Sequence, residues 1–181
     1  MKERTTKNIK KLVMASMCLA LCLVLPMVTG RIPQIGRALS PMHIPVLLCG
    51  FICGYQYGIG VGLIAPILSS LLFRMPPIYP MAVSMSVELA VYGCAAGLLY
   101  KMLPKKNLYI YVTLIIAMIT GRVAFGIMMA TLSSFSANIQ YSFKMFINGS
   151  FVTALPGIIL HIIVIPVLVI ALKKAGLMEN E

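Results

Sequence analysis

The sequence has few charged residues and very few acidic ones. Only 10% of its 181 residues are charged, and Asp and Glu together number 4. A soluble domain carries about 25% charged residues, so this chain has too little polar surface to cover a globule in water. Three of the acidic residues lie near the termini. This distribution excludes paired-carboxylate catalysis and argues against a carboxylate-rich metal site.

Signatures of enzymes are missing as well. The chain has no His-Glu-x-x-His, no Gly-x-Ser-x-Gly and no phosphate-binding Gly-x-x-x-x-Gly-Lys-Ser/Thr. We therefore predict no enzymatic activity, no cofactor and no metal site, and expect energy for uphill transport to come from another subunit or an ion gradient. The 5 cysteines lie within apolar runs and lack redox or zinc spacing, so we interpret them as small apolar fillers.

Long hydrophobic runs dominate what is present. Hydrophobic residues make up 60% of the chain, and the mean hydropathy is +0.98. A membrane-spanning helix needs about 20 residues. We predict one all-α transmembrane domain over residues 1–181, a bundle of six helices near 11–29, 42–57, 58–73, 81–101, 108–132 and 150–172. The first run is interpreted as a retained helix, because no good signal-peptide cleavage site follows it.

The basic residues predict the orientation of the bundle. The net charge is +11, but the cations form short clusters between apolar runs, which is typical of membrane topology rather than nucleic-acid binding. The cytoplasmic side would receive the basic N-terminus (residues 1–10), Lys101, Lys105, Lys106, Lys173 and Lys174. The outer side would receive Arg31, Arg37, Arg74 and Lys144. This majority predicts that both termini are cytoplasmic.

Two charged residues fall inside predicted spans. Counted from the outer ends of their helices, Glu88 would lie about 10 Å deep and Arg122 about 15 Å deep. Such a charge costs at least about 2.5–3.5 kcal/mol unless it has a partner or water. The two residues therefore form either a structural ion pair or part of a polar site open to the outside, and a pair shared with a solute would satisfy both interpretations.

Further polar and aromatic residues are weaker candidates for the same site. His161, halfway along the sixth run, is either a helix–helix hydrogen-bonding residue or a group that acts on solute or protons. His43 is predicted at the outer start of the second span, as an interfacial or solute-binding residue. Asn148 is predicted at the outer mouth of the sixth span, at the end of a polar outer segment. Tyr92 is one of few aromatic residues available for stacking, and the absence of Trp argues against a site for a large flat ring.

The first predicted helix carries a pair of small residues, Ser16 and Ala20, one turn apart. Such a pair allows another helix to approach closely. The partner is either a second protein or a helix of this chain.

Taken together, these features resemble the substrate-binding S components of energy-coupling factor (ECF) transporters. The resemblance covers nearly the whole chain and rests on six spans, a basic N-terminus and several short segments in order. These segments are 14–20 (MASMCLA), 42–50 (MHIPVLLCG), Gly58, Gly62, 75–77 (MPP), 87–93 (VELAVYG) and Gly121-Arg122.

The resemblance implies a high-affinity capture subunit for a vitamin or related micronutrient in a prokaryotic plasma membrane. Its implied partners are a transmembrane coupling subunit, two cytoplasmic ATPases and membrane lipid, and no nucleic acid. Ser16 and Ala20 match the family's Ala-x-x-x-Ala docking face, with Ser replacing the first Ala. Glu88, Arg122 and Asn148 match the region of the family's binding site.

The solute itself is less well defined. Arg122 and the outer basic residues favour a solute with a carboxylate or phosphate, such as a pantothenate-like compound. Two other functions stay open at this point. One is an ion-coupled secondary transporter using Glu88, Arg122 and His161, although no internal repeat is visible. The other is a membrane scaffold in which the charged pair is purely structural.

Overall fold

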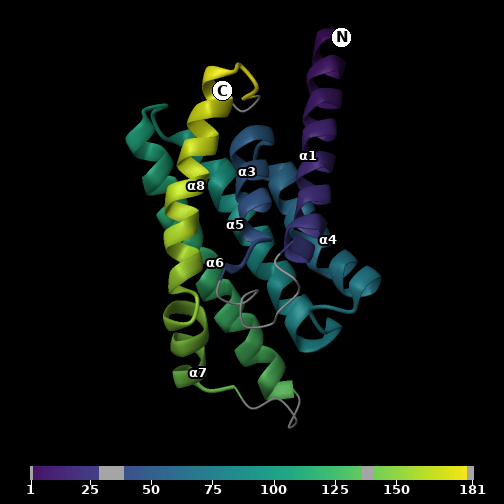
Figure 1. Cartoon of the computed structure of the whole chain (residues 1–181), viewed down its shortest axis with the longest axis vertical. Coiled ribbons are helices and arrows are strands. Elements are labelled where there is room, and N and C mark those ends of the chain that lie inside the picture. Colours follow the sequence, from purple (N-terminus) through teal and green to yellow (C-terminus); the bar gives the residue numbers. More distant parts are fainter. Residues whose placement is uncertain (1, 29–38, 136–140, 179–181) are drawn as a thin grey trace.

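A bundle of helices running along one long axis makes up the protein (Figure 1). The computed structural model describes residues 2–28, 39–135 and 141–178. Within these ranges every regular element is a helix, which confirms the predicted all-α fold. The long helices are α1 (Lys2–Val28), α4 (Tyr55–Phe73), α5 (Val83–Met102), α6 (Asn107–Phe135) and α8 (Leu155–Lys174). The start of α1 and the end of α8 lie at the same end of the bundle (Figure 1).

The long helices have the length and hydropathy of membrane spans. In the described part of the chain, 5 helices qualify: Thr5–Val28, Tyr55–Phe73, Ile78–Met102, Asn107–Phe135 and Leu155–Lys174. They correspond to the predicted runs near 11–29, 58–73, 81–101, 108–132 and 150–172. The multi-pass membrane bundle is therefore confirmed.

The second predicted span, 42–57, differs from the structure. Its helix, α3 (His43–Cys53), has only 11 residues and is about 16 Å long, roughly half of the ~30 Å hydrocarbon core. The helix ends at Gly54, whose φ of 96° is open to glycine but strained for other residues, and α4 begins at the next residue. All residues of α3 except Ile44 are buried. Hydropathy does not distinguish such an interior helix from a lipid-facing one, which is why the run was predicted as a short membrane span.

Close backbone contact joins α4 to α5. A Cβ atom added to Gly93 on α5 would collide with the backbone of Gly58 on α4. One turn further along, a Cβ atom on Gly62 would collide with the backbone at Leu89. Small residues let membrane helices approach closely, because dispersion contacts replace the hydrophobic effect there. These glycines therefore hold α5 firmly in the bundle.

Two short π-type turns lead into spans. Between α4 and α5, the hydroxyls of Ser69 and Ser70 donate to the carbonyls of Met75 and Pro76 at 2.9 and 2.6 Å, which closes the proline-rich loop before η1 (Ile78–Ala82). Before α8 lie the short helix α7 (Phe143–Ile147) and η2 (Asn148–Val152). The predicted sixth span, from residue 150, therefore begins as a helix only at Leu155.

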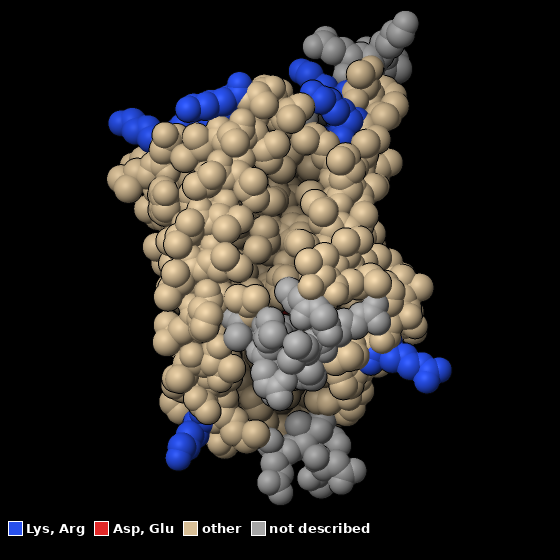
Figure 2. Space-filling view, viewed as in Figure 1, with Lys and Arg blue, Asp and Glu red and all other residues tan. Residues whose placement is uncertain are grey.

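The exposed basic side chains lie toward the ends of the bundle. On the face shown in Figure 2 they leave the flank between the two ends without charge. At the end where α8 finishes, the Lys173 ammonium donates to the Lys105 carbonyl at 2.9 Å and so ties the α5–α6 turn to α8. Arg31 and Arg37 lie outside the described residues. That both termini are cytoplasmic stays a prediction.

Candidate functional site

Four helices bring polar side chains together inside the bundle. Glu88 and Tyr92 lie one turn apart on α5, Arg122 comes from α6, His161 from α8, and His43 is the first residue of α3. All five are buried, with exposed fractions between 0% for Tyr92 and 8% for Arg122. Polar groups this deep in a membrane protein need partners or water.

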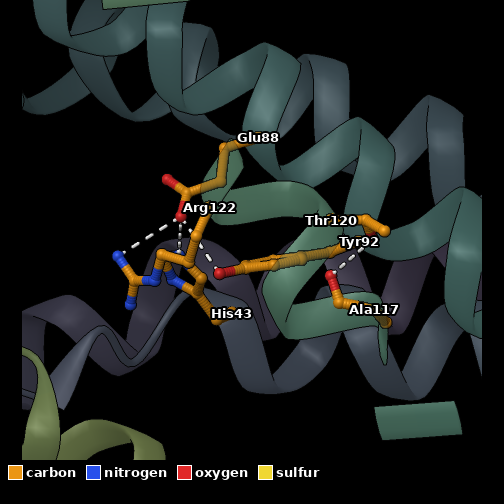
Figure 3. A network of polar contacts seen from close by, with 6 residues as sticks. All are labelled: His43, Glu88, Tyr92, Ala117, Thr120 and Arg122. Carbon is orange, nitrogen blue, oxygen red and sulfur yellow. Dashed lines mark hydrogen bonds and ion pairs between the residues drawn. The ribbon is translucent and has the colours of Figure 1, made fainter. Parts of the chain in front are cut away.

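One oxygen of Glu88 is the centre of this cluster (Figure 3). The Tyr92 hydroxyl donates to Glu88 Oε1 at 3.1 Å, and Arg122 Nη1 lies 3.3 Å from the same atom. His43 Nε2 is 3.5 Å from it and makes no hydrogen bond with any described residue. The second carboxylate oxygen points away from these three groups (Figure 3). The predicted proximity of Glu88 and Arg122 therefore exists, as a single contact and not a two-bond fork.

The position of His43 corrects the sequence-based prediction. It was expected at the outer surface, yet its exposed fraction is 3%. Because α3 is only half a span long, its first residue lies within the bundle, where the backbone N–H of His43 donates to the Ser40 carbonyl at 3.0 Å. The imidazole of His43 stacks with that of His161, with ring centroids 5.9 Å apart, and lies 5.1 Å from the Tyr92 ring. His43 thus connects α5 to α8.

Several buried polar atoms of the cluster have no hydrogen-bond partner in the described part of the chain. They are Arg122 Nε, both ring nitrogens of His43, and His161 Nε2. The hydroxyl of Tyr141, just before α7, also lacks a hydrogen-bond partner in these residues. Burial and the negative charge of Glu88 raise the pKa of Tyr141, so this phenol interacts electrostatically with the same carboxylate. Each unsatisfied buried group costs about 1–3 kcal/mol, which a bound solute would recover.

Gly121 positions Tyr92. A Cβ atom at Gly121 on α6 would overlap the Tyr92 ring, so only glycine lets the ring lie against α6 and direct its hydroxyl to Glu88. One residue earlier, the Thr120 hydroxyl bonds back to the carbonyls of Ala117 and Ile116 at 3.0 and 2.9 Å, which keeps it on its own helix (Figure 3). This role of Gly121 was not predicted from the sequence; a glycine directly before a buried arginine was the available signal.

An apolar groove adjoins the cluster between α6 and α8. Its volume is about 160 Å³, and Arg122 is the charged residue in its lining. The other lining residues are Ile115, Met118, Ile119, Phe151, Ile158 and Ile162. The groove is therefore suited to an apolar body whose polar end reaches Arg122.

The remaining predicted residues lie elsewhere. Asn148 is exposed at the start of η2 and takes no part in the contacts around Glu88. Ser16 and Ala20 are exposed on α1, whereas Ala15, Cys18 and Cys22 face the interior. The Ser16 hydroxyl bonds back to the Leu12 carbonyl at 2.9 Å. The small pair is therefore not used to pack α1 against the described helices. Part of the polar segment 133–148, residues 136–140, lies outside the described residues.

Comparison with known families supplies the identity. Residues 10–169, nearly the whole chain, match the family described as "ECF transporter, substrate-specific component". The chain belongs to this family. No match was found among curated proteins or among solved structures.

Membership makes this S component a multi-pass protein of the prokaryotic plasma membrane and a transporter subunit rather than an enzyme. It works with a substrate and an ECF module, and vitamin uptake is the general role of the family. The substrate is not specified by the family match.

Proposed function

We propose that this S component captures a small vitamin-like solute at the cluster of Glu88, Arg122, His43, Tyr92 and His161. The observation that carries the proposal is a set of buried nitrogen atoms around a carboxylate that have no hydrogen-bond partner among the described residues. A charge pair that served structure alone would be expected to satisfy its own donors, since unpaired polar groups in a membrane are costly. Solute binding supplies the missing partners.

Delivery depends on other subunits in this proposal. The exposed Ser16 and Ala20 on α1 dock on a transmembrane coupling subunit, and two cytoplasmic ATPases supply the energy. The outward orientation of the small pair supports this role, because small side chains let a partner helix approach closely. Asn148 stays a weaker candidate for solute contact, through its place at the entrance to α8.

An anionic solute of the pantothenate kind is one candidate, since Arg122 lies at the cluster. The contact between Arg122 and Glu88, however, already balances the charge of the guanidinium. Once Glu88 is taken into account, the charge at the cluster therefore gives weaker support for an anionic solute than Arg122 alone would give.

Binding by the purified protein tests the proposal. Calorimetry with the water-soluble vitamins should find at least one that binds at nanomolar to micromolar level. Glu88→Gln and Arg122→Ala should weaken this binding about 100-fold, because each leaves a buried partner unpaired. Lys106→Ala changes an exposed residue and serves as the matched control. Equal affinity in all three folded variants, or binding of no vitamin, would refute capture at this cluster.

A further inference from the structure

We infer, on the basis of the proposed capture at this cluster, that the solute places an uncharged group against Glu88 and Arg122. This group carries an N–H or O–H donor beside a carbonyl-type acceptor, as a primary amide, a cyclic amide or a urea does. The sequence favoured a carboxylate or phosphate, so the structure changes the expected chemistry.

Charge balance is the first reason. Glu88 and Arg122 are 3.3 Å apart, and both are more than nine-tenths buried. Together they carry no net charge. A carboxylate placed beside them would leave a negative charge uncompensated in a poorly hydrated site, and it would repel Glu88 at short range. A neutral polar group avoids both penalties.

Hydrogen-bonding capacity is the second reason. The three contacts of Glu88 all end on Oε1, so Oε2 is available to accept a hydrogen bond from a solute. Within the described part of the chain, Arg122 Nε is a donor without a partner. An ionised carboxylate of a solute only accepts, and it has nothing to offer Glu88 Oε2. An amide can donate to Glu88 Oε2, and its carbonyl can accept from an unpartnered nitrogen of the cluster such as Arg122 Nε.

The two histidines extend this complementarity. His161 Nε2 and both nitrogens of His43 lack partners in the described residues. A neutral imidazole has one donor and one acceptor nitrogen, so the two histidines can bind a group that both donates and accepts hydrogen bonds. Tyr141 adds a hydroxyl, which also donates and accepts.

The groove between α6 and α8 accommodates the rest of the solute. Its volume of about 160 Å³ is close to that of an apolar cavity of about 150 Å³ that holds one benzene molecule. Apart from Arg122 its lining is apolar, so it fits a short aliphatic chain or a small ring. The solute class is therefore a small amide-type head on a compact apolar body.

Two pairs of probes, whose members differ only in carrying a neutral amide or a carboxylate, test the inference. The pairs are nicotinamide with nicotinate, and hexanamide with hexanoate. Binding to the purified full chain is measured near neutral pH by saturation-transfer NMR and thermal stabilisation. Within each pair the amide should bind about tenfold or more tightly, because the anion leaves Glu88 Oε2 without a donor.

Charge variants sharpen the test. Glu88→Gln leaves Arg122 unbalanced, so the preference should reverse toward the anion. Glu88→Gln combined with Arg122→Gln restores neutrality and should remove that reversal, which keeps the test informative if the single variant folds poorly. Lys106→Ala should leave the preference unchanged.

Tighter binding of the anion to the wild-type protein would overturn the inference, and so would failure of both pairs to bind at millimolar concentration. In either case, Glu88-dependent binding of a vitamin would leave the proposed capture function intact. Absence of any Glu88-dependent binding would refute both.

Discussion

The contact between α4 and α5 differs in kind from the contacts of α8. Along α4 and α5, glycines allow backbone to lie against backbone, and 10 of the 20 residues of α5 are buried. Helix α8 buries only 5 of its 20 residues and lines the apolar groove; it carries His161, whose Nε2 has no hydrogen-bond partner among the described residues. Glu88 and Tyr92 are thus carried by a tightly held helix, whereas His161 faces them from a looser one.

This difference suggests a division of roles within the site. A carboxylate that must keep its orientation benefits from a scaffold with little freedom. A wall that admits a solute needs contacts that open at low cost, and regions with few buried contacts are where such motion concentrates. We therefore expect substitutions on α5 to act on stability and site geometry together, and those lining the groove to act mainly on solute binding.

The largest effect is expected from Glu88→Ala. Removal of the carboxylate leaves Arg122 buried and unpaired, which should lower the free energy of unfolding by about 3–5 kcal/mol. Thermal unfolding of the detergent-purified protein measures this. Combining it with Arg122→Met should recover much of the loss, because an apolar replacement of both partners is tolerated. A double variant no more stable than Glu88→Ala would show that the pair is not the cause.

A smaller loss is expected from Gly93→Ala. Its methyl group would collide with the Gly58 backbone, and overpacking of this kind costs about 1–3 kcal/mol. Gly60→Ala is the matched control on α4, because a Cβ atom there meets nothing within 4 Å. Alanine favours helix, so the control should be neutral or slightly stabilising. If both variants unfold at the same temperature, the close contact of α4 with α5 is not what holds the scaffold.

Gly121→Ala should act on the site with only a modest effect on folding. The added methyl group displaces the Tyr92 ring, and with it the hydroxyl that donates to Glu88. We expect solute affinity to fall about tenfold, in line with the loss of one hydrogen bond to a charged group. Tyr92→Phe removes the same hydrogen bond without crowding and should reproduce the loss. Full affinity in both would exclude Tyr92 as a positioning residue.

The smallest effect on solute binding is expected from Ala20→Leu. The substitution lies on the exposed face of α1. Affinity of the isolated protein should be unchanged, while uptake by cells that carry the whole transporter should fall, because a larger side chain keeps a partner helix at a distance. Lys106→Ala is the control. Copurification of the coupling subunit with Ala20→Leu at wild-type yield would count against docking at this face.

Some features could be predicted from the sequence because they depend on local composition. The spans other than residues 42–57 follow from run length and hydropathy, and the family follows from short segments in order along nearly the whole chain. The contact of Glu88 with Arg122 was also predictable, since two buried opposite charges on consecutive helices stabilise one another. The length of α3 was not, because its end depends on the conformation of Gly54.

By itself, then, the sequence determined a membrane bundle of the ECF substrate-specific family with a charged pair inside it. The tertiary structure decided that α3 begins within the bundle, and this placed His43 beside Glu88 and His161 rather than at the surface. It also decided that only one oxygen of Glu88 is engaged and that Ser16 and Ala20 face outward. Hydropathy reports whether a residue prefers to leave water. Which neighbour it meets depends on how helices distant in sequence pack against one another.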